Sequence, residues 1–382
     1  MLVQEQPIAA DINELGEKLL EGGRGAEALD FLELAVKQNP NNGRYANNLA
    51  IARFQSGDLN GAIEALEAAL RLGGDLRLFV LNFADLARTR PRLLRRGLEV
   101  CHAYLEQCGE DPDVLAAADL IAQEAAAADQ EFQAAVTTMP EHAKLKVNGA
   151  AEAAHLVEMG QNIANQILDS LDGIAEARTI LDFGVGLGRV LWPLSQKLPA
   201  AHFIGFDVDP MMLTSLEGVS AVADTQLVYT TADIPDNSVD AAYVISVFTH
   251  LDHTAEYWLW ELSRVLAPGG RALVTYHDKT LFDEKCQQLG VNLTFTGHTT
   301  LGEGAEGSTG LGTYYETEAW ERMVGQFFKI VRTEPRGLVG HQSFSVLEKG
   351  EGLVDSLALH RTYVRDLESE LYEMRKAADL KI

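Results

Sequence analysis

The sequence predicts two folded parts, an all-α repeat domain and then an α/β domain with a doubly wound parallel sheet, followed by one C-terminal helix. Three observations support this prediction. Residues 1–112 contain a repeat with a period of about 34 residues. Residues 151–350 alternate short apolar runs with amphipathic segments, as parallel strands and crossover helices do. The first of these runs leads into a glycine-rich turn within Ile180–Arg189, ILDFGVGLGR, where a sheet of this kind binds ligands.

Composition allows a buried core and disfavours one class of partner. The chain has 382 residues, of which 47% are hydrophobic and 23% charged, and its formal net charge is -25. Because such a charge repels a phosphate backbone, nucleic acid is not expected as a partner. Five arginines between residues 88 and 96 form a local basic patch, which we interpret as a solvated or acid-pairing helix face.

Cysteine usage and the termini predict a cytoplasmic protein. The three cysteines, Cys101, Cys108 and Cys286, lack metal-ligand spacing, and their odd number disfavours a disulfide framework. The N-terminal stretch has neither a basic segment nor an apolar segment of a secretory signal. No run of 18 apolar residues occurs, so no membrane span is expected.

The repeats align residues 9–42 with 43–76. Small residues at matching positions, Ala28 and Ala62, allow two antiparallel helices to approach, and Gly23 and Gly57 fall at the turn between them. The stretch NNLAIARFQSGDLNGAIEALEAALRL in the second copy resembles the tetratricopeptide family. A degenerate third unit follows over 77–112, which completes a domain at 1–112. Residues 113–150 are predicted to be a helical cap and linker.

Seven strands are predicted in the α/β domain, residues 151–350, with helices between the first five. Their expected bounds are Thr179–Phe183, His202–Asp207, Gln226–Thr230, Ala241–Val247, Arg271–His277, Phe327–Thr333 and His341–Glu348.

The glycine turn favours a cationic ligand. Gly184, Gly186 and Gly188 are spaced two apart, whereas dinucleotide sites have a wider second interval. Asp182 stands just before the first glycine, and a carboxylate there disfavours a phosphate and suits an amine-bearing ligand. Glycine also lets a ligand lie directly against the backbone.

Two more acids follow the next strand ends. Asp207 comes 25 residues after Asp182 and can accept hydrogen bonds from both hydroxyls of a ribose. Asp233 lies on a loop after the third strand. Asp209 precedes Pro210 and is expected to cap the next helix, and Asp240 at the start of the fourth strand is expected to be structural.

The stretch RVLAPGG, which ends a helix at Leu266 and enters the fifth strand, completes a pattern. In this order the motifs resemble class I S-adenosylmethionine-dependent methyltransferases, and VFTHL resembles their F-T-H-L group. The resemblance implies a Rossmann-like seven-stranded domain and S-adenosyl-L-methionine as cofactor. It implies cofactor binding by Asp182, Gly184, Gly186, Gly188, Asp207, Val208, Asp233, Ile234 and Ser246.

Methyl transfer to a hydroxyl needs alignment and a base. The candidate bases are His250 and His277, with His253 as a further histidine at a strand end. A glycine-rich insertion after the fifth strand is interpreted as a mobile flap over the acceptor, with Tyr314, Tyr315 or Trp320 as contact surfaces. The last predicted strand contains the pair Gln342-Ser343. Many members of the group have Gln-Asp in a similar strand.

We therefore expect a methyltransferase acting on a hydroxyl of a small molecule or saccharide, with a partner or peptide docked on the repeats. Two alternatives stay open: a protein methyltransferase whose repeats bind the substrate, and a cofactor-binding scaffold without catalysis. Apolar residues from Leu353 at intervals of four and three predict a heptad helix over 351–382. This coiled-coil pattern is compatible with a homodimer and with packing back onto the same chain.

Overall fold

The computed structural model describes residues 7–148, 152–304, 306–308, 310–338 and 341–350. The chain divides into two compact units, one comprising Met1–Glu131 with Gln196–Ala200 and the other comprising Phe132–Ser195 with Ala201–Ile382. The heptad helix predicted for 351–382, and with it the coiled coil and the homodimer, lies outside the described residues.

The first unit is a series of helices arranged as three antiparallel pairs, followed by one long helix. The pairs are α1 (Pro7–Glu21) with α2 (Gly25–Gln38), α3 (Gly43–Gln55) with α4 (Leu59–Leu72), and α5 (Leu76–Ala87) with α6 (Leu94–Cys108). The long helix is α7 (Pro112–Thr138), and its last residues belong to the second unit.

Small residues allow the paired helices to pack as the repeat pattern predicts. Ala28 and Ala62 are fully buried. A Cβ placed on Gly16 would lie 2.5 Å from Leu32 Cδ2, so a larger residue would require Leu32 to shift at this approach of α1 to α2. Gly23 and Gly57 both have positive φ at the turns, a conformation that costs other residues about 1–2 kcal/mol.

The arginine patch is an acid-pairing surface within this unit. Arg88 pairs with Glu124 at 2.9 Å, and Arg96 pairs with Glu67 at 3.0 Å. Arg95 similarly contacts Asp129. These arginines therefore connect helices of the repeat domain, as the sequence interpretation allowed.

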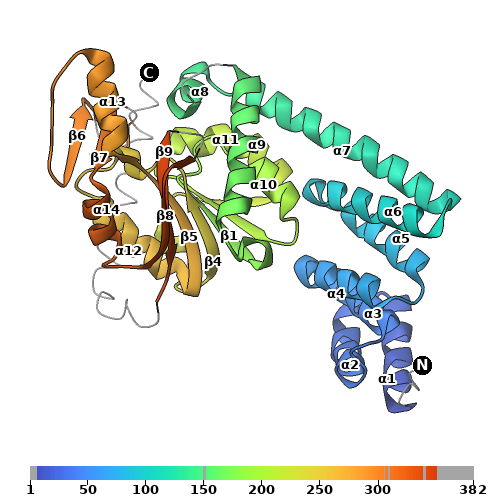
Figure 1. Cartoon of the computed structure of the whole chain (residues 1–382). Helices are drawn as coiled ribbons and strands as arrows, with labels where there is room; N and C mark the ends of the chain where they lie inside the picture. Colours follow the sequence, from blue (N-terminus) through green and yellow to red (C-terminus); the bar gives the residue numbers. More distant parts are fainter. Residues whose placement is uncertain (1–6, 149–151, 305, 309, 339–340, 351–382) are drawn as a thin grey trace. The chain divides into compact units, whose positions relative to one another are not determined.

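The second unit is a sheet flanked by helices. Figure 1 shows α9 and α11 on one side of the sheet and α12 and α14 on the other. The helices are α8 (Glu141–Asn148), α9 (Ala153–Ser170), α10 (Leu191–Lys197), α11 (Pro210–Ala223), α12 (Ala255–Val265), α13 (Lys279–Leu289) and α14 (Thr317–Val324). Among the described residues, no helix is both long and apolar enough to cross a membrane.

The strands are β1 (Thr179–Phe183), β2 (His202–Phe206), β3 (Thr225–Val228), β4 (Val239–Val244), β5 (Leu266–Asp278), β6 (His298–Gly302), β7 (Leu311–Tyr315), β8 (Lys329–Leu338) and β9 (Gln342–Glu348). β3, β2, β1, β4 and β5 are neighbours in that order and run parallel. β9 pairs antiparallel with β5, and β8 pairs antiparallel with β9. The predicted doubly wound, Rossmann-like fold is confirmed.

The strand count differs from the expected seven, because the described sheet has nine strands. The two additional strands, β6 and β7, form an antiparallel hairpin inside the glycine-rich insertion, and β7 pairs with the end of β5. Each is only five residues long and rich in Thr or Tyr, which favour strands. The surrounding glycines concealed this short pattern in the sequence.

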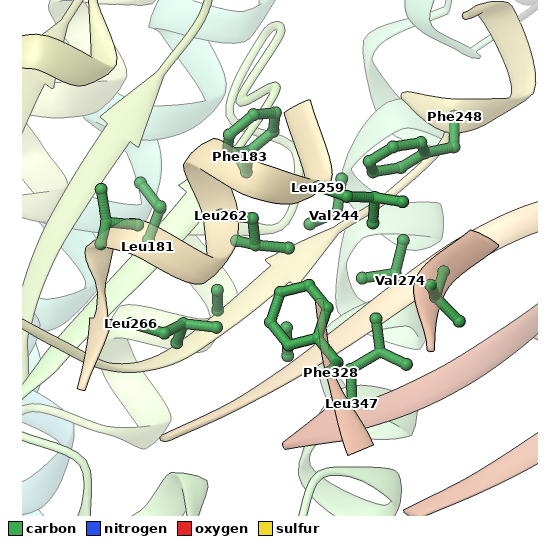
Figure 2. Packing of buried hydrophobic residues seen from close by; sticks show 14 of the residues in the cluster. Leu181, Phe183, Val244, Phe248, Leu259, Leu262, Leu266, Val274, Phe328 and Leu347 are labelled. Carbon is green, nitrogen blue, oxygen red and sulfur yellow. The ribbon is translucent and has the colours of Figure 1, made fainter. Parts of the chain in front are cut away.

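The core lies between the sheet and the helices α12 and α14. Figure 2 shows Leu259 and Leu262 of α12 packed against strand residues, among them Phe183, Val244 and Val274. Each of these side chains is at most 2% exposed. The parallel strands are apolar on both faces, as expected of a sheet covered by helices on both sides. This rigid core fixes the carboxyl edge of the sheet, where the candidate site residues lie.

Candidate functional site

The glycine turn between β1 and α10 adopts the backbone that its sequence requires. Gly184, Gly186 and Gly188 have φ values of +80°, +53° and +65°. A Cβ on Gly188 would lie 2.3 Å from Leu216 Cδ1, so this glycine allows close packing against α11. A Cβ on Gly186 would meet only Val147 Cγ2, at 3.4 Å. Gly186 is thus the position at which a ligand can approach the backbone.

Asp207, directly after β2, connects this turn to the second strand. Its Oδ2 accepts a hydrogen bond of 2.9 Å from the Gly186 N–H, and its Oδ1 accepts one of 2.9 Å from the Asp209 N–H. A carboxylate has about four acceptor positions on its two oxygens, so one such group can accept several hydrogen bonds at once. Asp209 caps α11 through the Met211 N–H, as predicted.

The residues after β4 lie against the same turn. A Cβ on Gly184 would be 2.3 Å from Val247 Cγ2, so the turn and the segment that follows β4 are in direct contact. Ser246 in that segment has φ of +63°, an uncommon conformation for a residue other than glycine. Its N–H donates to Thr275 Oγ1 at 2.8 Å, which ties the segment to β5. Backbone strain of this kind clusters at functional sites.

Asp182 is buried at the end of β1. Its Oδ2 accepts a 2.9 Å hydrogen bond from the Tyr243 hydroxyl on β4. The pKa of Asp182 is raised to about 7, mainly by burial and also by the nearby Asp207 charge. The Tyr243 hydrogen bond and the Arg189 charge act in the opposite direction and lower this pKa. Burial lowers the pKa of Arg189, whose Nη1 donates to the Val147 carbonyl at 3.0 Å. Asp182 therefore changes its charge near neutral pH, at a position that suits a cationic ligand.

Replacing Asp182 by asparagine is expected to change how stability depends on pH. The folded pKa of Asp182, about 7, lies above its ordinary value of 3.8. The folded state therefore binds more protons than the unfolded state between pH 4 and 7, and ionisation of Asp182 lowers stability as pH rises through that window. The variant lacks this loss, so its stability relative to the wild type should increase by up to about 4 kcal/mol between pH 4 and 8.

Urea unfolding without cofactor at pH 4 and pH 8 measures this difference. Tyr243→Phe is the matched control, because loss of its hydrogen bond should move the same decline to higher pH. Parallel pH profiles for the wild type and Asp182→Asn would contradict the pKa assigned to Asp182.

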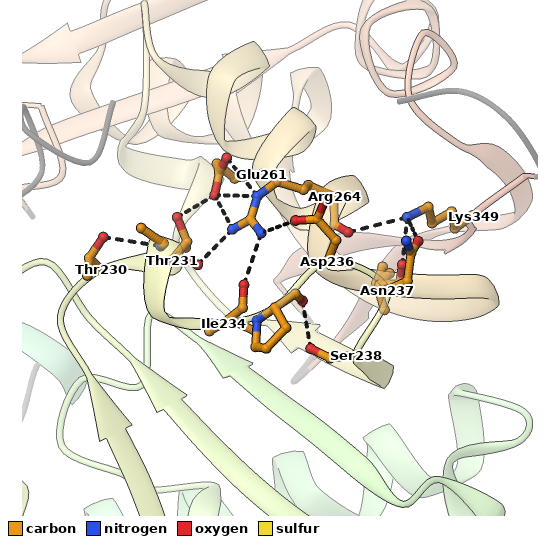
Figure 3. A network of polar contacts seen from close by, with 12 residues as sticks. Thr230, Thr231, Ile234, Asp236, Asn237, Ser238, Glu261, Arg264 and Lys349 are labelled. Atoms are coloured by element: carbon orange, nitrogen blue, oxygen red, sulfur yellow. Dashed lines mark hydrogen bonds and ion pairs between the residues drawn. The ribbon is translucent and has the colours of Figure 1, made fainter. Parts of the chain in front are cut away.

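A buried ion-pair network, which Figure 3 shows, contacts the backbone of the loop after β3. Arg264 of α12 donates to the carbonyls of Thr231 and Ile234 at 2.7 and 2.9 Å. It also pairs with Glu261 at 2.7 Å and with Asp236 at 2.8 Å. The backbone of Thr231–Ile234 is therefore fixed, with the Asp233 side chain exposed and the Ile234 side chain in the core.

His250, in the segment that follows β4, and His277, at the end of β5, lie close together. Their ring centroids are 6.5 Å apart. His250 Nδ1 lies 2.6 Å from the Leu311 carbonyl, which can only accept, so Nδ1 carries a proton and donates it to this carbonyl. The His277 ring stacks on Tyr314 of β7 with centroids 5.3 Å apart. His253 is exposed and contacts Asp252.

The environment of His277 keeps its ring neutral. Burial, together with the charges of Lys285, His250 and His341, lowers the pKa of His277 to about 3. Within the described part of the chain its Nδ1 has no hydrogen-bond partner. A neutral imidazole here can accept or donate a hydrogen bond to a ligand.

The insertion after β5 contacts the segment that contains His250. The Gly307 N–H donates to the His250 carbonyl at 2.9 Å, and Glu306 accepts from the Thr254 N–H at 2.9 Å. Trp320 is fully buried, stacks on Tyr276 with centroids 4.6 Å apart, and donates to Ser345. The interpretation of Trp320 as an acceptor contact is therefore wrong, because the core needs this large apolar ring.

Several residues of the site carry no recognisable sequence signal. Tyr243, Val247 and Thr275 contact predicted site residues only because neighbouring strands bring them there. Gln342 is different, since it belongs to the pair Gln342-Ser343, which departs from the usual Gln-Asp pair at Ser343. Ser343 Oγ donates to Asp278 Oδ2 at 2.6 Å, so this serine has a structural role in connecting β9 to the end of β5. The described residues contain no group of three or more His, Cys, Asp or Glu side chains arranged for a metal ion.

Comparisons with known protein families find two different families in two parts of the chain. Residues 181–272 match a methyltransferase domain family, and residues 19–77 match a tetratricopeptide repeat family. The chain thus contains a methyltransferase domain, which defines its class, together with tetratricopeptide repeats at its N-terminal side. Both family predictions from the sequence are confirmed.

Individual relatives are more distant. The chain is 33% identical over 104 residues to demethylmenaquinone methyltransferase of Thermus thermophilus, covering 25% of this chain and 46% of that protein. It therefore spans about half the length of this relative.

Among solved structures, 1,6-didemethyltoxoflavin-N1-methyltransferase of Burkholderia thailandensis, bound to S-adenosylhomocysteine, is 14% identical. That match covers 58% of this chain and 90% of that chain, with a TM-score of 0.37. An O-methyltransferase family 2 protein of Planctomyces limnophilus in complex with apigenin is 20% identical. It covers 49% of this chain and 56% of that chain, with a TM-score of 0.36.

Proposed function

We propose that this chain is an S-adenosylmethionine-dependent methyltransferase that acts on a hydroxyl group of a small molecule or saccharide. The hydrogen bond from the Gly186 N–H to Asp207 carries the proposal, because it joins the two predicted cofactor motifs at one point of the sheet edge. The methyltransferase domain match over residues 181–272 supports the same class of reaction.

The residues of the sheet edge fit this cofactor. Asp207 would accept hydrogen bonds from the two ribose hydroxyls, and the open backbone at Gly186 would contact the methionine part. Asp182 would face the cationic end of the ligand. The remaining cofactor contacts that we propose are Gly184, Gly188, Val208, Asp233, Ile234 and Ser246. When bound, S-adenosylmethionine supplies an electrophilic methyl group that is attached to a sulfonium sulfur. Once the methyl group is transferred, the sulfur remains as a neutral thioether.

His250 is the proposed proton acceptor for the hydroxyl. Its Nδ1–H donates to the Leu311 carbonyl, so Nε2 would be the basic atom of the neutral ring. His277 would bind the acceptor as a neutral ring, since a pKa of about 3 makes it a weak base. If His250→Asn kept the turnover and pH profile of the wild type, this assignment of the base would be wrong.

Calorimetry with S-adenosylmethionine tests the cofactor. We expect the wild type to bind it and Asp207→Ala to bind at least about 10- to 100-fold more weakly, because the loss of even one charge-assisted hydrogen bond costs about 1.5–3 kcal/mol. Asp209→Ala is the matched control, since it removes an acid two residues away that caps α11. It should lose about 1 kcal/mol of stability and keep its affinity. Absence of binding to the wild type rejects the proposed function.

The acceptor class needs a separate experiment. The protein is incubated with methyl-labelled cofactor and cell extract, and the label is followed into small-molecule, saccharide and protein fractions. Label in the first two supports our proposal, in which the repeats dock a partner protein or peptide. Label in a protein band would instead favour repeats that present a protein substrate. No labelled product, with cofactor bound, would favour a scaffold.

A further inference from the structure

The buried hydrogen-bonding atoms that have no partner within the described residues include a pair on the neighbouring strands β5 and β9. The two atoms of this pair are His277 Nδ1 at the end of β5 and Gln342 Oε1 at the start of β9. His277 is 9% exposed and Gln342 is 6% exposed. An unsatisfied buried polar atom costs about 1–3 kcal/mol, so two of them together indicate groups that a ligand completes.

The sheet register brings these two side chains together. β5 and β9 are antiparallel, and their last registered pair is Tyr276 with Ser343. His277 and Gln342 are the next residues on the two strands, so their Cβ atoms should lie about 5 Å apart on one face of the sheet. The Gln342 amide extends across the end of β5, where Nε2 donates to Ser246 Oγ at 2.8 Å. This bond orients Oε1 as the atom that needs a donor.

The site is also in contact with the proposed cofactor turn. Ser246, which holds the Gln342 amide, is followed by Val247, and a Cβ on Gly184 would lie 2.3 Å from Val247. His250, on the same segment, lies 6.5 Å from His277 between ring centroids. The two unsatisfied atoms therefore lie beside the segment that contains the proposed base, His250.

The surrounding charges restrict the ligand. Lys285 Nζ lies 5.6 Å from the centroid of Tyr314, the ring that stacks on His277, and disfavours a cationic amine. An ionised carboxylate or phosphate has no hydrogen to donate to Gln342 Oε1. The acids nearby are engaged, since Asp278 accepts from Ser343 and Leu281, and Glu284 pairs with Arg336. These contacts together favour a neutral donor.

We propose that His277 and Gln342 form an acceptor subsite for a neutral molecule with two adjacent hydroxyl groups, one bound by each residue. This inference rests on the proposed function and specifies its acceptor. A vicinal pair fits because the two protein atoms belong to neighbouring strands and each binds one group. The same chemistry occurs in catechols and in saccharide diols, and the experiment separates these two sources.

Matched pairs of probes test the subsite with the full chain saturated with S-adenosylhomocysteine. Catechol is compared with phenol, and cis-cyclohexane-1,2-diol with cyclohexanol, so that each pair differs by one hydroxyl. Dissociation constants come from ligand-observed NMR. We expect the diol of at least one pair to bind about tenfold more tightly than its partner. Preference within the aromatic pair points to a phenolic acceptor, and preference within the alicyclic pair points to a saccharide-like one.

Gln342→Leu should abolish the preference for the diol, and its affinity for S-adenosylhomocysteine is measured first so that the probes are compared on the saturated protein. Gln342→Asn, whose amide is one methylene shorter, gives the same test if the leucine variant fails to fold. In the wild type, the diol should also shift the His277 ring resonances, which His277→Asn identifies by their loss. With S-adenosylhomocysteine bound, equal binding within both pairs, no binding of any probe, or a preference that survives both Gln342 variants overturns the inference. Failure to bind S-adenosylhomocysteine would reject the proposed function instead.

Discussion

Arg264→Ala is expected to lower the free energy of unfolding by about 3–5 kcal/mol, because it removes one partner of a buried ion pair. Arg264 is 4% exposed and Glu261 is 2% exposed. In the variant the Glu261 carboxylate would stay buried without its guanidinium, and the carbonyls of Thr231 and Ile234 would lose their donor. Because these carbonyls hold the loop that contains Asp233, affinity for S-adenosylmethionine should fall as well.

Chemical denaturation of the single variants and of one double variant measures this effect. Arg271→Ala is the control, since the Arg271–Glu348 pair is partly exposed and should contribute about 1 kcal/mol or less. Arg264→Met combined with Glu261→Met should be more stable than Arg264→Ala, because no uncompensated charge is then buried. A loss for Arg264→Ala no greater than that for Arg271→Ala would show that this network does not stabilise the domain.

Gly186→Ala is expected to weaken S-adenosylmethionine binding on the order of 100-fold, since displacements of about 1 Å at a site can have effects of this size. The protein itself can accommodate the methyl group, because its nearest atom would be Val147 Cγ2 at 3.4 Å. The methyl group would instead occupy the space in which we place the ligand. The positive φ of +53° adds a stability cost of about 1–2 kcal/mol.

Gly173→Ala provides the matched control for backbone strain. Gly173 also has a positive φ, +86°, and a Cβ there would meet nothing within 4 Å. Both variants should lose similar stability in thermal unfolding, while calorimetry should reveal a loss of affinity only for Gly186→Ala. Equal affinities for the two variants would mean that the ligand does not approach Gly186.

Local sequence patterns predicted the elements of the α/β domain closely. β1 was predicted with the bounds that the structure has, and β2 differs by one residue. Asp209 and Asp240 have the structural roles assigned to them, since Asp209 caps α11 and Asp240 accepts from the N–H groups of Arg178 and Thr179. The strand bounds and the Asp209 cap depend on neighbours in sequence, which explains why they could be predicted. The Asp240 contacts are different, because they reach residues 61 and 62 positions away.

Features that depend on cross-strand neighbours could not be predicted in the same way. The β6–β7 hairpin is stabilised by pairing with β5 at His277 and Asp278, and its own residues form only two short runs. Trp320 follows a glycine-rich stretch and looks like a loop residue, yet it is part of the core because α14 packs on the sheet. Burial of a side chain depends on which elements meet, and no periodicity was long enough to show it.

The sequence by itself determined the spacing of Gly184, Gly186 and Gly188 and the order of the acids after the strands. Both follow from local backbone requirements, and they identify the class of domain. Only the tertiary structure decided that Asp207 holds the Gly186 N–H, that Arg264 supports the loop after β3, and that Gln342 crosses β5 to Ser246. These contacts join residues 21 to 96 positions apart, so they exist only once the sheet has aligned its strands.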